Sequence, residues 1–542
     1  MKLLPVAVVS HGVRPAQGYT PRRFCYKRRF CNMDTAADHT ENTDGDIVSG
    51  GATFKQRVYT AVSVFSVAIL HTRKKKDFTM KISFHGADRD VTGSCHLVEC
   101  AGRRILIDCG LYQGGRELEE ENAEPFGFEP ADIDFLLLTH AHLDHCGRIP
   151  LLARRGFRGE IVTTAATREL ARLVMLDAAH LQEEDAAYRL RKAVRHGSST
   201  SAIQPLYTTL DALNSLDFFG RTARYGEPLQ LAPGIRATFV DAGHILGSAC
   251  VFLQLEDQGR SRSLLFSGDL GNSGRPILRD PAPPPQADVV VMETTYGDRR
   301  HKRLEPSVEE LYDAINDTFR RGGNVVIPTF ALERSQEILY YLREGVEGGR
   351  IARTTQVFLD SPMAISATRI FKRHPECYDT ETMDLFREGR DPFHLPALRF
   401  TRETAESMAI NRIGGGAVIM AGSGMCTGGR VRHHLRHNLW RRESSVVFVG
   451  YAAQGTLARH IIDGARQVHI FGEQMPVRAH IYTIGGFSAH ADQAELLAWH
   501  GRTGNPQTTY LVHGEEDAMH RFAARLKNTR VEMPSLHEAC PL

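Results

Sequence analysis

Between residues 80 and 298, short apolar runs alternate with polar or glycine-containing turns, a pattern typical of strands with helices between them. The runs at 96–100 and 104–108 flank Ala101-Gly102 and predict a hairpin. The uninterrupted apolar run at 134–138 predicts a buried strand. Further strands are predicted at 81–84, 235–240, 250–255, 263–267 and 289–293, and helices at 151–155, 167–176 and 182–195.

From residue 299 to 483 the pattern changes to helices alternating with short apolar strands. Helices are predicted at 308–321 and 334–345, and strands at 324–328, 357–360, 417–421, 446–449 and 467–471. This alternation is typical of a separate α/β module with a largely parallel sheet. Residues 484–542 return to strand, loop and helix elements, with histidines in the loops.

Residues 1–79 show no sustained period. They predict a disordered extension, or a start assigned too early, with Met80 as the real first residue. The longest apolar run, 58–70, would form ~20 Å of helix, short of the ~30 Å hydrocarbon core of a bilayer. We therefore expect no membrane span, and a weak surface anchor followed by Lys74-Lys75-Lys76 is the alternative.

Charge and composition limit the functions that the chain can be expected to have. The 542 residues carry a net charge of +2, which divides into +7 on residues 1–79 and −5 on the remainder. Global charge therefore gives no reason to expect non-specific nucleic-acid binding, and any anion site must be a local patch or a metal centre. Ten cysteines without C-x-x-C spacing indicate reduced thiols in a cytoplasmic protein. The 25 histidines invite a search for metal ligands and proton-transfer groups.

The strongest candidate site is the segment His140-Ala141-His142-Leu143-Asp144-His145, directly after the predicted strand 134–138. In an extended loop, side chains two apart point the same way, so His140 and His142 can hold one ion. If the chain then turns into a helix, Asp144 and His145 are directed toward a second ion. Mixed imidazole and carboxylate ligands favour catalytic zinc.

Four ligands cannot complete two metal sites, so others must come from distant segments. Three candidates follow apolar strands and are flanked by glycine, which lets the backbone approach a compact site: His244, Asp269 and His513. Each alone could be an ordinary turn residue. Asp108 also ends an apolar strand, and there a carboxylate can accept the free N–H of a ligand histidine and fix its tautomer.

This set of residues resembles the metallo-β-lactamase superfamily. Residues 292–297 (Met-Glu-Thr-Thr-Tyr-Gly) and 486–492 (Gly-Phe-Ser-Ala-His-Ala-Asp) resemble the first two motifs of its β-CASP family, and His513 stands at the third. The resemblance covers residues from about 80 to about 525 and is nearest to the compact bacterial and archaeal zinc-dependent ribonucleases. These are related to ribonuclease J and to the nuclease subunit of the cleavage and polyadenylation complex.

The resemblance implies an α/β fold: an αββα metallo-β-lactamase sandwich with an inserted α/β β-CASP domain. The core would comprise residues 80–298 and 484–542, and the β-CASP domain residues 299–483. Two zinc ions per chain are implied, one held by His140, His142 and His244 and the other by Asp144, His145 and His513. Asp269 would bridge them.

The resemblance also implies a mechanism for cleaving RNA. Two metal ions lower the pKa of a shared water, and the resulting hydroxide attacks phosphorus, leaving 3′-hydroxyl and 5′-phosphate ends. His490 would protonate the leaving oxygen, and Glu293 would hold its imidazole and favour the charged form. The alternatives for His490 are another zinc ligand or a structural turn residue. Histidine at position 513 is typical of the RNA-processing branch, whereas the DNA-repair branch usually has valine there.

The insert is expected to hold single-stranded RNA. Residues 299–483 carry a net charge of +5, and 24 of their 26 basic residues are arginine, which binds phosphate and stacks on bases. A glycine-rich turn between strand 417–421 and the next helix exposes backbone N–H groups, as phosphate sites do. It resembles the family's RNA-contacting loop. The candidate RNA contacts are Ser423, Gly424, Met425, Gly428, Gly429 and Arg430, with Ser361 nearby.

Two other functions stay open at this point. One is a small thioester or lactone hydrolase of the same superfamily, against which the long insert and His490 speak. The other is a non-catalytic RNA-binding relative, against which the intact set of ligands speaks. Endonuclease and 5′-exonuclease action are both open, as is a homodimer.

Residues 1–79 carry none of these motifs. A chain that starts at Met80 is therefore expected to fold and to cleave RNA at the rate of the full chain. Thermal unfolding and RNA cleavage of the two proteins, measured side by side, check this. An insoluble or inactive short chain would show that the extension belongs to the fold.

Overall fold

The computed structural model describes residues 80–542 except 115, 198, 201–202 and 451. The expectations for residues 1–79, including the apolar run at 58–70, lie outside the described residues. Within the described part of the chain, no helix is long and apolar enough to cross a membrane. The eight cysteines described are all free thiols, which agrees with the expected reduced state.

The first layer of the fold is a seven-stranded sheet that begins at Lys81. The predicted hairpin is confirmed, with His96–Cys100 antiparallel to Arg103–Ile107. The strand at the chain's end pairs with the first strand, and Leu542 N–H bonds to the Met80 carbonyl. In sheet order the strands are β22 (Ala539–Pro541), β1 (Lys81–Phe84), β2 (His96–Cys100), β3 (Arg103–Ile107), β4 (Phe135–Leu137), β5 (Glu160–Thr164) and β6 (Phe219–Ala223).

A second seven-stranded sheet packs on the first. Buried side chains from both sheets, such as Ile82, Val98, Phe239 and Val251, form one hydrophobic core between them. The predicted strands at 235–240, 250–255, 263–267 and 289–293 all lie here. The order is β21 (Arg530–Glu532), β20 (Thr508–Val512), β11 (Val289–Glu293), β10 (Arg260–Phe266), β9 (Ala249–Asp257), β8 (Ile235–Asp241) and β7 (Leu229–Ala232).

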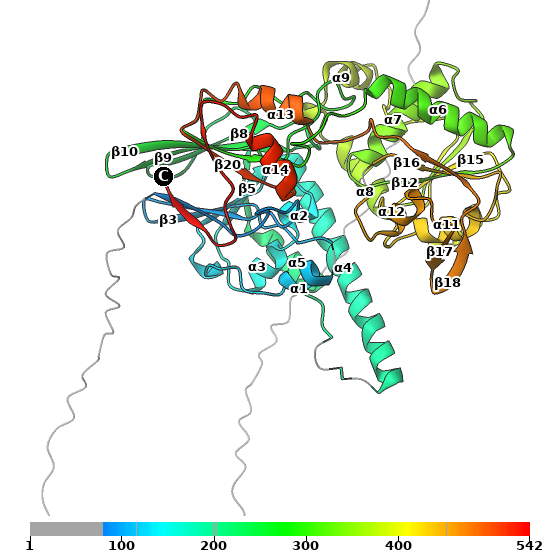
Figure 1. The fold of residues 1–542 in the computed structure, drawn as a ribbon, viewed down its shortest axis with the longest axis horizontal. Coiled ribbons are helices and arrows are strands. Elements are labelled where there is room, and N and C mark those ends of the chain that lie inside the picture. Colours follow the sequence, from blue (N-terminus) through cyan, green and yellow to red (C-terminus); the bar gives the residue numbers. More distant parts are fainter. Residues whose placement is uncertain (1–79, 115, 198, 201–202, 451) are drawn as a thin grey trace, which may run out of the picture. The chain divides into compact units, whose positions relative to one another are not determined.

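Helices cover both outer faces, which makes the αββα sandwich that was expected (Figure 1). On the outer face of the first sheet, Leu136 packs with Leu152 and Leu170. On the outer face of the second, Met292 packs with Trp499 and Phe522. The covering elements are α1 (Arg116–Glu121), η1 (Pro130–Asp132), α2 (Leu143–Cys146), α3 (Ile149–Arg154), α4 (Ala165–His196), α5 (Thr209–Ser215) and η2 (Leu216–Phe218) on one side, and α13 (Gln493–His500) and α14 (Glu516–Ala523) on the other.

The two helices predicted at 167–176 and 182–195 are one continuous helix, α4. The residues between them, Asp-Ala-Ala-His-Leu at 177–181, include no glycine or proline, so nothing interrupts the hydrogen-bond ladder. The helix begins where the Thr164 hydroxyl accepts the Thr167 N–H. It ends at Gly197, whose left-handed φ of 65° closes the last turn.

The insert is built around a third sheet, which has six strands. All of its strand pairs are parallel, as the helix–strand alternation predicted. The sheet order is β14 (Leu398–Phe400), β13 (Gln356–Leu359), β15 (Ala417–Ala421), β12 (Val325–Pro328), β16 (Ser445–Phe448) and β19 (His480–Thr483). The helices are α6 (Leu304–Arg320), α7 (Arg334–Glu347), α8 (Pro362–Phe371), α9 (Thr380–Arg387), α10 (Thr404–Ile410), α11 (Val431–Asn438) and α12 (Leu457–Ile462), with the short turn η3 (Pro375–Cys377).

One strand predicted for this sheet lies elsewhere. Residues 467–471 were expected as a buried strand, but β17 (Gln467–Ile470) pairs antiparallel with β18 (Glu473–Pro476) in a separate hairpin. Phe471 and Gly472 both have positive φ, 54° and 83°, which is the backbone of a two-residue hairpin turn. The hairpin lies outside the six-stranded sheet, and only alternate side chains of β17, those of Val468 and Ile470, are buried.

We propose a division of the chain into residues 80–298, 299–483 and 484–542. It is supported by the sheets: strands β1–β11 and β20–β22 belong to the sandwich, and β12–β16 and β19 to the insert. The insertion point lies between β11 and β20, which are parallel neighbours with Glu293 opposite Val512. The sandwich is therefore continuous in space although it is interrupted in sequence.

The strand order brings four strand ends to one place. Strands β10, β11 and β20 are adjacent and parallel, so Glu293 at the end of β11 meets Asp269 and His513, which follow β10 and β20, at one edge. The loop after β4 reaches the same edge from the other sheet, where Ala249 N–H bonds to the Thr139 carbonyl. This convergence of strand ends positions the candidate site.

Candidate metal centre

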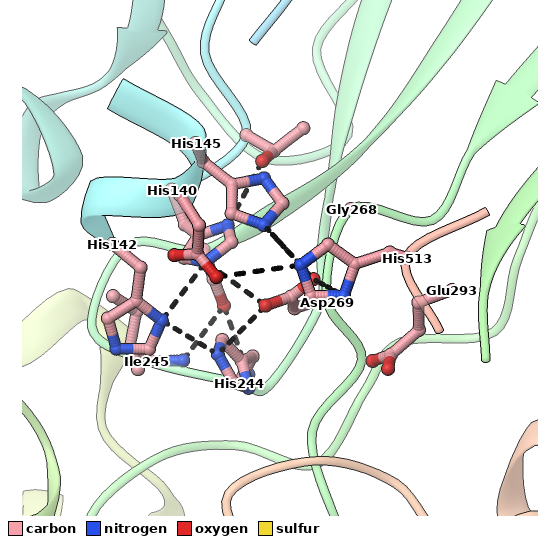
Figure 2. A network of polar contacts seen from close by, with 12 residues as sticks. His140, His142, His145, His244, Ile245, Gly268, Asp269, Glu293 and His513 are labelled. Carbon is pink, nitrogen blue, oxygen red and sulfur yellow. Dashed lines mark hydrogen bonds and ion pairs between the residues drawn. The ribbon is translucent and has the colours of Figure 1, made fainter. Parts of the chain in front are cut away.

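Three imidazole nitrogens converge at the end of β4. His142 precedes α2 in extended conformation (φ −71°, ψ 151°), and its Nδ1 lies 3.2 Å from both His140 Nε2 and His244 Nε2. Figure 2 shows the three rings turned toward one another. Bonds of 2.0–2.1 Å from a tetrahedral zinc place neighbouring nitrogens about 3.3 Å apart, so this spacing fits one ion.

A second group lies beside the first. His145 Nε2 is 3.3 Å from His513 Nε2, which in turn is 3.6 Å from Asp144 Oδ2. Within each group the candidate ligand atoms all lie within 4.8 Å of one another. The structure thus brings together all seven residues expected as metal ligands, in the two sets that the resemblance implied.

Asp269 stands between the two groups and presents one carboxylate oxygen to each. Its Oδ2 lies 3.4 Å from His140 Nε2 and 3.5 Å from His244 Nε2. Its Oδ1 lies 3.3 Å from His145 Nε2 and 3.6 Å from His513 Nδ1. Oδ1 is buried and accepts no hydrogen bond from the described residues, so it has lone pairs free for a cation.

Outer contacts hold the ligand rings. Asp108 Oδ2 accepts the Nδ1–H of His145 at 2.7 Å, as expected for a carboxylate that fixes a ligand tautomer. Both oxygens of Asp108 also accept from Thr139, at 2.8 Å from its N–H and from its hydroxyl. His244 Nδ1 lies 3.2 Å from the Ala489 carbonyl, and the Thr295 hydroxyl lies 3.1 Å from His513 Nδ1.

Sequence reasoning missed two of these outer contacts. The Ala489 carbonyl is a backbone group, so no side-chain pattern could single it out. Thr295 lies within the motif at 292–297, and its position two residues after Glu293 was the available signal.

His490 lies next to the metal ligands and bonds to Glu293. Its Nδ1 is 3.2 and 3.3 Å from the two Glu293 oxygens, and its ring centroid is 4.5 Å from that of His244. Burial alone would lower the pKa of His490, but the Glu293 charge and hydrogen bond raise it to about 9. Divalent cations in the two ligand groups would act in the opposite direction.

Glu293 is completely buried, and its Oε1 also accepts the Leu270 N–H at 2.6 Å. Asp269, Glu293 and His513 form a third cluster of the same compactness, so Glu293 is also within reach of a metal. Because its oxygens already serve Leu270 and His490, we assign it to His490. His490 itself belongs to none of the ligand clusters among the described residues.

The glycine-rich loop follows β15 and precedes α11, as expected. It is closed on itself by Val431 N–H to the Gly422 carbonyl and Ser423 N–H to the Gly428 carbonyl. Gly424 lies so close to the Phe330 ring that a Cβ there would come within 2.9 Å of it. A small cavity at the carboxyl ends of β12, β15 and β16 is lined by Pro328, Phe330, Arg334, Gly424, Phe448, Val449 and Gly450.

Two of the expected RNA contacts are occupied within the protein. The Arg430 guanidinium bonds to Asp360 Oδ1 at 2.7 Å and to the carbonyls of Thr401 and Arg402. Ser361 begins α8, and its hydroxyl oxygen accepts the Ala364 N–H. These contacts favour positioning roles for both residues. Contact of Ser423, Gly424, Met425, Gly428 and Gly429 with RNA stays a prediction.

Three family profiles match the chain. Residues 88–328 match the metallo-β-lactamase superfamily, residues 335–461 the β-CASP domain, and residues 474–534 the RNA specificity domain of zinc-dependent metallo-hydrolases. Ribonuclease TTHA0252 of Thermus thermophilus is 41% identical over 466 residues, 85% of this chain and 100% of that protein. The chain belongs to the β-CASP family of the metallo-β-lactamase superfamily.

Archaeal members of the β-CASP family are also similar to this chain. The transcription termination factor FttA of Methanocaldococcus jannaschii is 32% identical over 82% of this chain and 69% of its own length. FttA of Methanosarcina mazei is 32% identical over 85% of this chain and 71% of its own length.

Membership of the metallo-β-lactamase superfamily implies a divalent metal, and the electrostatics of the candidate ligands fit one. Burial lowers the pKa of His140 and His244 and brings that of His142 to about 3, so these imidazoles are neutral donors near pH 7. Burial alone would raise the pKa of Asp269, but the charges of His513 and His145 hold it well below its usual range. Neutral imidazoles and ionised carboxylates are the forms that bind metal.

The carboxylates around the second ligand group favour protonation of its histidines. Burial alone would lower the pKa of His145 and His513, but the Asp269 carboxylate, together with Asp108 for His145 and Asp144 for His513, raises both. A cation would replace these protons as the partner of the carboxylates.

Asp269→Asn is expected to weaken metal binding by more than the ~10–100-fold that outer-shell changes cost. The amide keeps the shape but loses the charge and one of the two oxygens that face the ligand groups. Metal content after dialysis against a graded zinc buffer measures this. Asp288→Asn is the matched control, because Asp288 bonds to Ser263 and lies in no ligand cluster. Normal metal content in Asp269→Asn would contradict the bridging assignment.

Proposed function

We propose that this β-CASP nuclease is a zinc-dependent ribonuclease that holds two zinc ions and leaves 3′-hydroxyl and 5′-phosphate ends. The observation that carries the proposal is the Asp269 carboxylate, shared between two sets of ligands beside the His490–Glu293 pair. One ion would be held by His140, His142 and His244, and the other by Asp144, His145 and His513. Two such ions supply Lewis acidity, which lowers the pKa of the attacking water and offsets charge on the phosphate.

The residues of the chain account for the proton of the leaving group. Glu293 is fixed by the Leu270 N–H and accepts Nδ1–H of His490, so the ring has one orientation. That leaves Nε2 as the nitrogen that can donate a proton to the ribose 3′-oxygen as the bond to phosphorus breaks. A general acid must first lie within hydrogen-bond reach of the atom that it protonates, and only then does its pKa matter.

RNA as the substrate is supported by the relatives and by the insert. The relative that this chain spans completely is named a ribonuclease, and residues 474–534 match an RNA specificity domain. The insert carries a net charge of +5. Single-stranded RNA is favoured because His140, His244 and Asp269 are almost fully buried, which leaves little room for a duplex.

Digestion of one RNA oligomer, labelled at its 5′ end in one sample and internally in another, tests the function. Cleavage that a chelator stops and zinc restores, with 3′-hydroxyl and 5′-phosphate products, is expected. Comparing 5′-phosphate with 5′-hydroxyl substrates separates 5′-exonuclease from endonuclease action. A protein that hydrolyses a thioester but not RNA, or that cleaves neither, would refute the proposal.

His490→Ala is expected to retain its zinc and to lose ~10²–10⁴-fold in rate on RNA, because the variant removes the acid and not a ligand. The deficit should be much smaller on a nitrophenyl phosphodiester, whose leaving group needs no proton. Steady-state rates on the two substrates, with metal content measured in parallel, check the prediction.

Glu293→Gln serves as the partner variant. It should slow RNA cleavage in the same direction, and the double variant should be little worse than His490→Ala alone, since both act through one proton. Equal deficits of His490→Ala on both substrates would assign His490 to positioning or to metal binding instead.

A further inference from the structure

The insert contacts the sandwich at the turn that carries His490, residues 485–491, here called the His490 turn. Gly486 lies against α6, where a Cβ would come within 2.0 Å of Ser307 Oγ. Phe487 is fully buried, with its ring centroid 5.9 Å from that of Tyr341 and 6.0 Å from the Arg334 guanidinium, both on α7. The first half of the turn is thus held by helices of the insert.

The second half of the turn is held mainly through its backbone. The carbonyl of Ser488 accepts from Arg275 Nη2, and that of Ala489 faces His244 Nδ1 at 3.2 Å. The carbonyl of His490 accepts from His301 Nε2 at 3.1 Å. Ala491 N–H bonds to the Leu270 carbonyl at 2.8 Å. A shift of this turn would therefore move His490 and the partner of a metal ligand together.

Arg275 connects this turn to helix α7. It lies between β10 and β11, and its side chain is only 11% exposed. Nη1 forms an ion pair with Glu337 Oε1 at 2.9 Å, while Nη2 donates to the Ser488 carbonyl. Glu337 lies in the first turn of α7 and also pairs with Arg334. A single guanidinium group therefore bridges Glu337 of the insert and Ser488, which lies two residues before His490.

The backbone at the start of α7 is also constrained. Glu333 has φ 59° and ψ −60°, and Arg334 N–H bonds to the Leu332 carbonyl at 2.7 Å, a strained three-residue turn. Burial and the neighbouring Glu337 raise the pKa of Glu333 to about 8, and contact with the Leu246 N–H opposes this rise. Leu246 follows the metal ligand His244 by two residues, so the start of α7 touches both the His244 loop and, through Arg275, the His490 turn.

We propose that Arg275 is a positioning residue through which the insert holds the His490 turn. It touches neither metal ligands nor reacting atoms, and it acts by fixing the Ser488 carbonyl against α7. The inference rests on the proposed role of His490 as the proton donor. It predicts that the buried ion pair of Arg275 with Glu337 contributes to the coupling between the insert and His490, the proposed proton donor.

Arg275→Met tests the proposal without leaving an unpaired charge, because Glu337 keeps Arg334 as its partner. The flexible apolar side chain fills much of the same space. We expect ~10–100-fold lower kcat on RNA, the usual cost of losing an outer-shell contact, with KM and metal content near those of the wild type. The loss on a nitrophenyl phosphodiester should be several-fold smaller. Arg275→Lys should recover only part of the rate, since one ammonium cannot span Glu337 and the Ser488 carbonyl.

Arg279→Met is the matched control. Arg279 lies four residues further along the same segment and pairs with Asp241, away from the His490 turn. Its variant should match the wild type on both substrates. Equal losses on RNA and on the ester in Arg275→Met, or wild-type rates on RNA, would overturn the proposal.

Amide exchange of the zinc-loaded proteins gives a readout that does not depend on the reaction. The Ala491 amide should exchange faster in Arg275→Met than in the wild type and in Arg279→Met. Unchanged exchange would overturn the positioning role even if RNA cleavage is slowed. If His490→Ala lowers the rate equally on RNA and on the ester, the proposed acid role of His490 is refuted. If His490→Ala lowers the rate more on RNA than on the ester but Arg275→Met does not, only the role of Arg275 is refuted.

Discussion

The active site depends on one buried carboxylate. Asp269 is surrounded by imidazoles from both sheets, and each of its oxygens faces a different group of them. An isolated carboxylate at this depth would be costly to ionise, and an array of buried imidazoles would resist being brought together with cations. Each arrangement stabilises the other, so the charge of Asp269 allows the two groups of candidate ligands to share one small volume.

The carboxylates around this centre differ in the groups that they contact. Asp269 and Asp144 face nitrogens of the candidate ligands directly, whereas Asp108 bonds to His145 and reaches His140 through the Thr139 hydroxyl. Glu293 bonds to His490 and also clusters with Asp269 and His513. The two outer carboxylates are held by backbone N–H groups of Thr139 and Leu270. Because a fixed outer carboxylate sets which nitrogen of its histidine bears the proton, His145 presents Nε2 to its ligand group, and in the proposed mechanism His490 would present Nε2 to the leaving group.

Much of this centre was predictable because its candidate ligands follow apolar strands and accompany a segment with four ligand-type residues, His140 to His145. His140, Asp269 and His513 were found in that way. The sequence could not show which side chains the protein itself occupies: Arg430 appeared free for phosphate but bonds to Asp360, and Ser361 begins a helix. Such pairing depends on which loops lie opposite each other in space.

The errors in predicting two of the secondary-structure elements also have local causes. Helix α4 was split because its apolar period weakens where the helix leaves the core, although no breaker lies there. The segment at 467–471 was placed in the parallel sheet because its apolar content outweighed the signal of one glycine. Arg275 carried no signal at all, since an arginine in a loop looks like any exposed charge until its neighbours are known.

The position of the insert explains why such a contact can matter. Residues 299–483 enter between β11 and β20, which are adjacent strands. The chain leaves the site just after Glu293 and returns to it through the turn that carries His490, ahead of α13 and His513. In the role proposed for Arg275, its contacts with Glu337 and with the Ser488 carbonyl link the His490 turn to α7 of the insert. The candidate metal ligands His140, His142 and His145, by contrast, follow β4 within the sandwich, whereas under the proposal above the placement of His490 depends on the insert.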